Sequence, residues 1–443
     1  MHFSAQSSQA VPSVESDLEA ALTPGVLSAL MRSTWTWDDR ALRRDLSGLL
    51  VQLDAGRAVS RTDVAHACFA ATLRARSLAS AAGFVAAVLG PKLIADTGNP
   101  FRDQFLAAAS DPAMYDRQAA AALAQVHARA VRYLESIAHN VDYPPESSWP
   151  ALVRRKGQAG LGAAMRAYGN TLSSSSLFAS IGLAWQTLGV EGDHAASNAE
   201  KLERDAISAT FAAAEQSGSW DPALVRTRAT PGTDGWLLTG LKQFVPGCAG
   251  ADLIFTIARS VAGPSLFAVD ASAPGLEVTE LASMDTTRPL YQVTLAETPA
   301  ALVGSEGTGG QLLMRAIDLA TTALAAEQVG LIEKAVTVLL AHTGDRTPSA
   351  AVGARMAEVA LDHLAAASLW QRAMAAGADE SSVAAAVAHI VCSAACIRVA
   401  TATAEIAGPS AESAVILRRA ISGTLLFGGP ALSHERLLDR LGM

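Results

Sequence analysis

The residue types that most often do chemistry in proteins, cysteine and histidine, are scattered along this chain. Thiolates and imidazoles bind metals or act as nucleophiles and bases when they occur at set spacings. Cys392 and Cys396 share a helix face, but no CxxC pair accompanies them, and the nine histidines show no HExxH motif. We therefore predict that the four cysteines are buried free thiols and that the chain holds no metal.

Two other kinds of catalytic motif are incomplete or missing. The glycine-rich stretch GSEGTGG at 304–310 lacks the lysine of a phosphate-binding loop and the GxGxxG spacing of a dinucleotide site. The sequence also has no GxSxG elbow of a serine hydrolase. We interpret 304–310 as a flexible crossover from a strand into a helix.

The segment LTGLKQFVPGCAGADLIFTIAR, residues 238–259, differs in character from the helical text around it. Two β-branched and aromatic runs flank small residues at 246–250, which predicts a hairpin of two strands joined by a tight turn. Similar short runs follow at 265–270, 276–281 and 291–297, separated by Gly, Pro and Asp. Together they predict an antiparallel sheet domain of roughly 90 residues.

Alanine-rich helical segments lie on both sides of this sheet. Apolar residues recur three and four apart before about 141, from about 150 to 213, and again from about 310 onward. DYPPESSWP at 142–150 interrupts this periodicity, because paired prolines remove backbone donors. The predicted fold class is α+β. It has a helical domain over 1–210 with an extra N-terminal region and a possible boundary near 142–150, a small antiparallel β-sheet domain over 211–305, and a C-terminal helical bundle over 306–443.

The composition limits the class of partner. Half of the 443 residues are hydrophobic, 17% are charged, and the formal net charge is -8. Phosphate-rich surfaces attract concentrated Lys and Arg, so we expect neither a nucleic-acid nor a membrane partner. The polar N-terminus has no signal-peptide pattern, and we expect no uninterrupted apolar stretch of about 20 residues. We therefore expect a cytoplasmic protein.

Four stretches of the chain are similar to segments of one enzyme family. FAAAEQSGSWDPALVRTRA at 211–229 resembles that family's T-E-P-x-x-G-S-D segment, and 235–259 resembles its G-x-K-x-[FW]-[IV]-[TS]-N hairpin. The stretch at 266–304 is similar to a strand pair with an M-D-x-R turn, and 316–336 to the first helix of the last domain. On these stretches the chain resembles the acyl-CoA dehydrogenase family, as a divergent member.

The resemblance implies an FAD cofactor between the sheet domain and the last helices. The turn at 245–249 would face the flavin ring, although small residues also suit an ordinary tight turn. Pro246 stands where the family has Ser or Thr, and it offers neither a hydroxyl nor an N–H. The cofactor-binding residues that the resemblance implies are Ala214, Glu215, Ser219, Val245, Pro246, Gly247 and Arg346. Of these, Arg346 is what remains of a motif whose Arg and Gln reach the pyrophosphate of FAD bound to a neighbouring subunit.

Dehydrogenation of an acyl thioester needs a carboxylate that removes the α proton while hydride leaves the β carbon. The position of the glutamate base in many family members aligns with Phe427, which cannot serve. A second subgroup's base motif is similar to EIAGPSAESAVILRRA at 405–420, which makes Glu412 the candidate base. A helix cap or a surface position is the alternative for Glu412. Asp318, on a helix that carries the base in other members, is the second candidate.

The function implied by the resemblance is FAD-dependent α,β-dehydrogenation of an acyl thioester on CoA or on a carrier protein. The departures at Ala214, Pro246, Arg346 and Phe427 also fit a catalytically degenerate paralogue that acts as a partner subunit. An oxygenase or a non-redox reaction on the same scaffold is a third alternative. We expect an oligomer, either with itself or with a related subunit, packed through the apolar C-terminal helices.

Overall fold

The structure is a computed structural model that describes residues 22–59, 66–95, 98–103, 105–106, 112–139, 142–191, 195–204, 207–233, 235–344, 348–408 and 410–443. The chain divides into two compact units, Met1–Ala124 with Leu441–Met443, and Gln125–Arg440. The division falls within the long helix α7 (Pro112–His139), so this helix contributes to both units.

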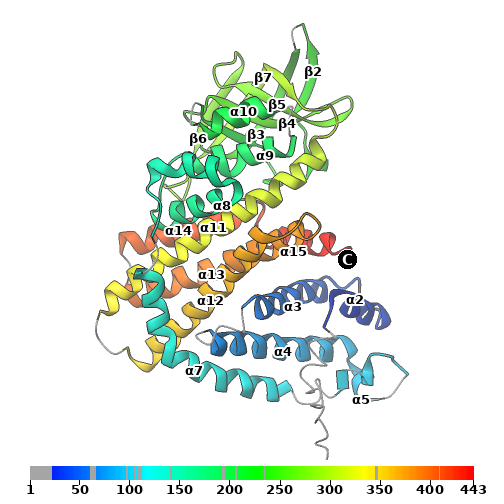
Figure 1. Ribbon diagram of the computed structural model, residues 1–443. Helices are drawn as coiled ribbons and strands as arrows, with labels where there is room; N and C mark the ends of the chain where they lie inside the picture. The colour runs from blue at the N-terminus through cyan, green and yellow to red at the C-terminus, as the bar shows by residue number, and fades with distance from the viewer. Residues whose placement is uncertain are drawn as a thin grey trace, which may run out of the picture. The chain divides into compact units, whose positions relative to one another are not determined.

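The first unit is helical (Figure 1). Thr23 and Asp39 cap two of its helices, because their side chains accept from Val26 N at 3.3 Å and from Ala41 N at 2.8 Å. Buried leucines on the first two helices and buried alanines, valines and phenylalanines on the third form its core. The described helices that lie wholly in this unit are α2 (Pro24–Ser33), α3 (Arg40–Ala58), α4 (Ala67–Leu89) and α5 (Pro91–Ile94).

The second unit begins with helices that follow the proline-rich break at 142–150. Trp149 opens helix α8 and is buried, and its Nε1 donates to the carbonyl of Pro144 at 2.9 Å. Pro150 lies in the first turn of α8. A backbone N–H at this position would have no intrahelical acceptor, so the missing N–H of proline costs no hydrogen bond. This part contains η1 (Glu146–Ser148), α8 (Trp149–Asn170), the π-helix η2 (Phe178–Trp185), α9 (Gln186–Glu191) and α10 (Ala196–Glu203).

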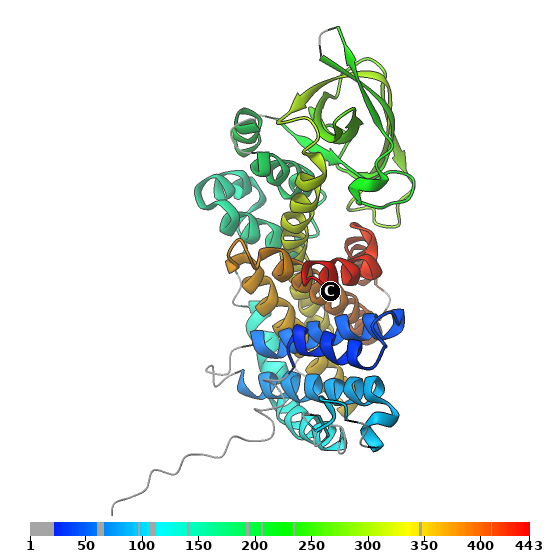
Figure 2. The same ribbon diagram turned by 90° about the vertical axis from the view of Figure 1, so that its right-hand side faces the viewer.

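The described strands of this unit form one seven-stranded sheet in the order β1-β4-β2-β3-β7-β5, with β6 paired to β7. A further pairing of β4 with β5 closes the order into a ring, and the sheet curls accordingly (Figure 2). The pairs β1–β4 and β2–β4 are parallel, whereas the others are antiparallel. The strands are β1 (Ala209–Ala212), β2 (Arg228–Gly232), β3 (Gly235–Pro246), β4 (Leu253–Ser260), β5 (Gly263–Asp270), β6 (Leu276–Leu281) and β7 (Leu290–Val303), with η4 (Pro222–Leu224) between β1 and β2.

The hairpin predicted at 238–259 is wrong in its pairing, although both strands exist. β3 pairs with β2 and β7, whereas β4 pairs with β1, β2 and β5. The two strands instead contribute to a shared core, in which Leu238 and Val245 pack with Ile254 and Phe267. Local residue patterns predict strands, but the partners of a strand depend on segments far away in the sequence.

The C-terminal helices are organised around α11, which runs from the sheet into the helical bundle in both views (Figures 1 and 2). It packs against α8 so closely that a Cβ at Gly330 would lie 1.8 Å from the carbonyl oxygen of Arg166. On the facing helix, a Cβ at Gly169 would lie 2.0 Å from the carbonyl oxygen of Glu327. The helices are α11 (Gly309–Thr343), α12 (Ala350–Ala375), α13 (Ser381–Ala407), α14 (Ala411–Leu425) and α15 (Gly429–Arg440).

Two helices, Ala67–Leu89 and Ser381–Ala407, are long and apolar enough to cross a membrane by length and composition alone. The expectation that the chain has no apolar stretch of about 20 residues is therefore wrong for these two helices. The most apolar part of each is 56% and 67% buried inside the protein, respectively. Core helices of folded domains have this character, and the packing accounts for both.

Candidate functional site

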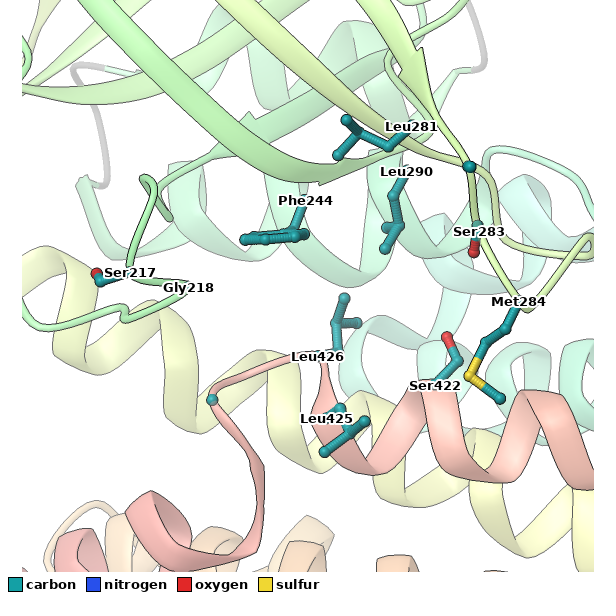
Figure 3. Close-up of a pocket in the computed structure, with 12 residues that line it drawn as sticks. Ser217, Gly218, Phe244, Leu281, Ser283, Met284, Leu290, Ser422, Leu425 and Leu426 are labelled. Atoms are coloured by element: carbon teal, nitrogen blue, oxygen red, sulfur yellow. The ribbon is translucent and has the colours of Figure 1, made fainter.

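A pocket of about 420 Å³ lies between the sheet and the C-terminal helices of the second unit (Figure 3). β3, β6, β7 and the loop between β6 and β7 form one wall, and the end of α14 forms the other. Its volume is typical of small-molecule sites. Among the described residues that line it, none has an ionisable side chain. The lining residues are Ser217, Gly218, Phe244, Leu281, Ala282, Ser283, Met284, Leu290, Ser422, Leu425, Leu426 and Gly428.

Phe244 projects from β3 into this pocket (Figure 3). Its φ of 58° is one that bulky residues rarely adopt, and it lies in the register shift between Lys242 and Val245. Gly218 faces the ring from a loop, since a Cβ there would lie 3.6 Å from Cε2 of Phe244. The sheet therefore holds a strained residue whose ring is presented to the pocket, a type of strain that clusters at functional sites.

The turn that the resemblance places against a flavin is packed in a different direction. Val245 is buried, and the carbonyl of Pro246 accepts from Oγ1 of Thr210 on β1 at 2.6 Å. Gly247 has a φ of 61°, and a Cβ there would lie 2.7 Å from Cβ of Ala179 on η2. Pro246 and Gly247 thus lie against β1 and η2, and Val245 belongs to the core of the sheet domain. None of the three is among the residues that line the pocket.

Glu215 keeps the spacing of the family motif and is fully engaged within the sheet domain. Its carboxylate accepts from the backbone N–H groups of Arg226 and Thr227, both at 2.9 Å, and from Oγ1 of Thr227 at 2.7 Å. Nζ of the completely buried Lys242 donates to it at 2.9 Å. Burial favours a raised pKa for Glu215, but Lys242 and Thr227 outweigh it and hold that pKa below its usual value. Burial lowers the pKa of Lys242 to about 8.

Two further predicted residues, Ala214 and Ser219, lie on either side of the loop residues that line the pocket. Ala214 is buried, and its carbonyl accepts from Gln243 N at 2.9 Å. Oγ of Ser219 accepts from Asp221 N at 3.1 Å. Ser217 and Gly218, which lie between the predicted residues Glu215 and Ser219, are the residues of this loop that line the pocket.

Phe427, at the position aligned with a catalytic glutamate, is completely buried in a row of aromatic side chains. Its ring lies edge-on to Trp220, with a centroid distance of 4.9 Å, and Trp220 lies 5.9 Å from Phe211. On another side, the ring centroid of His389 is 6.3 Å from that of Phe427. Trp220 and Phe427 both replace smaller or polar family residues, and together they fill space next to the pocket.

The candidate base Glu412 lies on the surface of the helical bundle. It is half-exposed in the first turn of α14, and its carboxylate pairs with Nζ of Lys334 at 2.7 Å. Ten residues of helix, about 15 Å, separate it from Ser422, which lines the pocket. The structure therefore does not bring Glu412 to the pocket of its own chain, and its role as a base stays a prediction.

The other candidate base, Asp318, is buried on α11 and is already paired. Its carboxylate accepts from Oγ of Ser382 at 2.7 Å and forms an ion pair with Arg440. These contacts join α11 to α13 and α15, which is a structural use of the carboxylate. The predicted phosphate ligand Arg346 lies outside the described residues.

A buried cluster of two arginines and one glutamate joins the sheet to the bundle. Arg288, in the loop before β7, and Arg419, on α14, both pair with Oε1 of Glu327 on α11, the latter at 2.9 Å. All three side chains are at most 3% exposed. The guanidinium groups also lie over the rings of Phe178 and Tyr168, respectively. Glu327 is the carboxylate that both guanidinium groups share, and its loss would be costly because a buried charge without its partner is destabilising.

A second cavity of about 240 Å³ lies between α13 and the chain around α15, and His389 lines it. Burial, and then the charge of Arg436, lower the pKa of His389 to about 4. Its Nδ1 lies 3.4 Å from Oγ of Ser393, which in turn contacts the amide of Gln328. His389 is therefore neutral at pH 7 in the folded protein.

We expect the His389→Gln variant to lose less stability in acid than the unchanged protein. In the unfolded chain this imidazole titrates near its ordinary pKa of about 6.5, so between there and its folded pKa the unfolded state binds more protons. Stability is present above the unfolded pKa and is lost as the pH falls, by about 2 kcal/mol between pH 7.5 and pH 5. Urea unfolding of both proteins at the two pH values measures this difference. An equal loss in both would contradict the assignment.

Reasoning from the sequence missed Phe244 as the pocket-facing residue of β3, although the motif contained it. Successive side chains of a strand point to opposite faces of the sheet, so a buried Val245 predicts that Phe244 points to the other face. Met284 and Leu425 also line the pocket while 50% and 55% exposed, respectively. Their clustering could not be read locally, because they lie far apart in the sequence.

Comparisons with known proteins agree with this architecture. Residues 210–295 match the family described as acyl-CoA dehydrogenase, middle domain. Cyclohex-1-ene-1-carbonyl-CoA dehydrogenase of Geobacter metallireducens is 30% identical over 146 residues, which are 31% of this chain and 38% of that protein. The match to this curated relative thus spans less than two fifths of its length.

Two solved structures share the fold over a larger part of the chain. The ChsE4-ChsE5 complex from Mycobacterium tuberculosis is 18% identical, with a TM-score of 0.58, and the similarity covers 72% of this chain and 97% of that one. The FAD complex of PigA is 17% identical, with a TM-score of 0.59 and the same coverage of both chains. Residues 210–295 thus match the acyl-CoA dehydrogenase middle domain, and the chain shares the fold of these two solved structures over 72% of its length.

Proposed function

We propose that the chain is a subunit of an FAD-dependent acyl thioester dehydrogenase and that a related partner chain supplies the catalytic base. The observation that carries this proposal is a pocket with apolar walls whose described lining residues include no ionisable side chain. The named activity of the Geobacter relative supports the reaction class, and the two-protein ChsE4-ChsE5 complex supports a partner. A cytoplasmic location is part of the proposal.

The pocket fits the ring of a flavin. Phe244, Leu281 and Leu290 form one apolar wall and Leu425 and Leu426 the other, so a planar ring can lie between them (Figure 3). Hydroxyl groups are available at its edge for the polar atoms of the ring, from Ser217, Ser283 and Ser422. The described lining residues offer no cation for the cofactor's diphosphate, which must bind outside this pocket.

In this arrangement the chain's own residues bind and orient the reactants rather than transfer protons. FAD, when bound, supplies the acceptor for the hydride that leaves the β carbon. Phe244 and Leu425 cover the pocket with apolar surface and exclude water, which strengthens the electrostatic interactions inside. Phe427 and Trp220 pack against each other beside the pocket, so the chain has no carboxylate of its own at the position of Phe427.

The missing step is removal of the α proton. A general base must come within hydrogen-bond reach of the proton that it removes. Glu412 and Asp318 are paired with Lys334 and Arg440, respectively, and neither lines the pocket. A carboxylate from a partner chain therefore has to complete the site in the proposed enzyme.

The first measurement is an anaerobic absorption titration of the purified chain, alone and co-expressed with related chains that carry Glu at the position of Phe427. We expect the chain alone to show no thioester-dependent bleaching of flavin, and a complex with one such partner to show bleaching with a specific acyl-CoA. Bleaching by the chain alone would overturn the need for a partner. Absence of flavin both from the chain and from every complex would overturn the assignment as a flavoprotein subunit.

A further inference from the structure

The cavity of about 240 Å³ between α13 and the chain around α15 is separate from the pocket. Among the described residues, none lines both spaces. The stretch 424–430 contributes different residues to each of them, since Leu426 lines the pocket whereas Pro430 lines the cavity. We call this second space the His389 cavity, after the imidazole that lines it.

His389 is held by a hydrogen-bond chain that fixes the position of its proton. Nε2 of Gln328 donates to Oγ of Ser393 at 2.9 Å, and the hydroxyl of Ser393 donates to Oε1 of Gln328 at 3.3 Å. A hydroxyl group has one hydrogen, so Ser393 can only accept from Nδ1 of His389, which lies 3.4 Å from it. Because His389 is neutral at pH 7, its proton is therefore on Nδ1.

Nε2 of His389 is consequently a hydrogen-bond acceptor without a partner. The lone pair of a neutral imidazole lies on the nitrogen that carries no proton. Among the described residues, no group donates to this nitrogen, and Nε2 is not one of the unpartnered polar atoms that the protein encloses completely. Since His389 lines the cavity and is only 3% exposed, this lone pair opens into the cavity. A ligand that donates a hydrogen bond there would satisfy an acceptor that is otherwise costly to bury.

Two hydroxyl groups of the cavity also keep only the capacity to accept. Oγ1 of Thr424 donates to the carbonyl of Ala420 at 2.9 Å, and Oγ of Ser433 donates to the carbonyl of Gly429 at 3.1 Å. These contacts use the single hydrogen of each hydroxyl. Together with Nε2 of His389, the two oxygens favour a ligand that donates hydrogen bonds. Isoleucine, alanine and proline side chains form most of the remaining wall, so the rest of the ligand should be apolar.

The charge and the size of the cavity limit the ligand further. The described lining residues include no Lys, Arg, Asp or Glu, and their ionisable side chains are those of His389 and His434. A carboxylate or an ammonium ion would therefore be buried there without a permanent counter-charge, which is costly. An apolar cavity of about 150 Å³ can bind benzene, so a cavity of about 240 Å³ has room for a small substituted benzene ring.

We propose that the His389 cavity is a binding site for a neutral hydroxyl compound of the size of a phenol, whose hydroxyl group donates to Nε2 of His389. The ring of such a ligand would lie against the isoleucines of α13. The site uses none of the described residues that line the pocket. It therefore requires neither FAD, nor a thioester, nor a partner chain, and the inference goes beyond the proposed function.

The experiment compares two probes of nearly the same shape, 4-fluorophenol and 4-fluorotoluene, of which only the phenol donates a hydrogen bond. Their dissociation constants for the full chain are measured by fluorine NMR, and about 1 mM or tighter is expected for the phenol. His389→Leu should weaken the phenol about tenfold and leave the toluene within about twofold. Ala394→Leu fills the cavity and should weaken both probes about tenfold. His342→Leu, the same change at an exposed imidazole on α11, is the matched control and should have no effect.

The outcomes separate the cavity from other places where the probes could bind. A selective loss of the phenol in His389→Leu, with loss of both probes in Ala394→Leu, supports the site. The inference is overturned if the phenol does not bind, if His389→Leu leaves its affinity unchanged, or if binding survives Ala394→Leu and thus lies elsewhere. Where His389→Leu does not fold, nitrogen NMR of the unchanged protein decides: the phenol, unlike the toluene, should shift the resonance of an unprotonated imidazole nitrogen, and no such shift would contradict the proposal.

Discussion

Replacing Glu327 with Gln is expected to lower the free energy of unfolding by about 3–5 kcal/mol. The carboxylate is the shared partner of two guanidinium groups, and all three side chains are nearly inaccessible to solvent. Glutamine keeps the shape but removes the charge, which leaves Arg288 and Arg419 buried without the carboxylate that they share. Among the described residues, Nε and Nη1 of Arg288 and Nη2 of Arg419 already have no hydrogen-bond partner, so the loss of a charged acceptor falls on groups that are incompletely paired. Urea unfolding at pH 7.5 measures the loss.

The matched control is Glu412→Gln, which also removes one carboxylate from an ion pair in the same bundle. Glu412 and Lys334 are 47% and 26% exposed, so water screens the pair and its loss should cost no more than about 0.5 kcal/mol. Because the glutamate-to-glutamine change is the same, the difference between the two variants reports burial and the second arginine. Similar small losses in both variants would show that the Glu327 cluster does not hold the sheet to the bundle.

Replacing Gly330 with Ala is expected to cost about 3 kcal/mol or to prevent folding of the second unit. The added methyl group would lie 1.8 Å from the carbonyl oxygen of Arg166, which is backbone and cannot rotate away. Helices α8 and α11 would have to separate along a contact that Gly169 forms from the other side. The separation would also disturb the pairing of Arg166 with Glu333, whose carboxylate accepts from Nε of Arg166 at 2.8 Å. Thermal unfolding followed by circular dichroism measures the effect.

Gly353→Ala is the control for this substitution. It lies within α12, and a Cβ there would have no neighbouring atom within 4 Å. Alanine is the better helix former, so this variant should be more stable by about 0.5–1 kcal/mol. The two changes add the same methyl group to a helix and should act in opposite directions. A Gly330→Ala protein as stable as the unchanged one would refute the tight crossing of α8 and α11.

Much of the fold could be predicted from the sequence because its signals are local. Periodicity of three and four residues predicts the long helices, and the β-branched runs at 265–270 and 276–281 coincide with strands in the structure. The proline-rich segment that begins at 142 separates α7 from α8, because its paired prolines cannot continue a helix. The strand partners could not be predicted, and the hairpin expected at 238–259 is two strands with different neighbours.

The residues of the pocket were predicted less well from the sequence than the fold was. The family motifs locate the segments around the pocket, at 214–221 and 240–247, because motif spacing survives when single residues change. Within those segments Val245 packs in the core of the sheet domain and Gly247 lies against η2, whereas Phe244 faces the pocket. The decisive feature is the register shift before Val245, which depends on the pairing of β3 with β7.

By itself, then, the sequence determined the kind of elements, their order and the resemblance of 210–295 to one family's middle domain, since each rests on residues close together in the chain. Only the tertiary structure decided which side chains meet. It placed Phe427 against Trp220, Glu412 beside Lys334, and an uncharged set of residues around the pocket. The physical reason is that packing and charge pairing act between segments far apart in the sequence, and no local pattern encodes which of those segments meet.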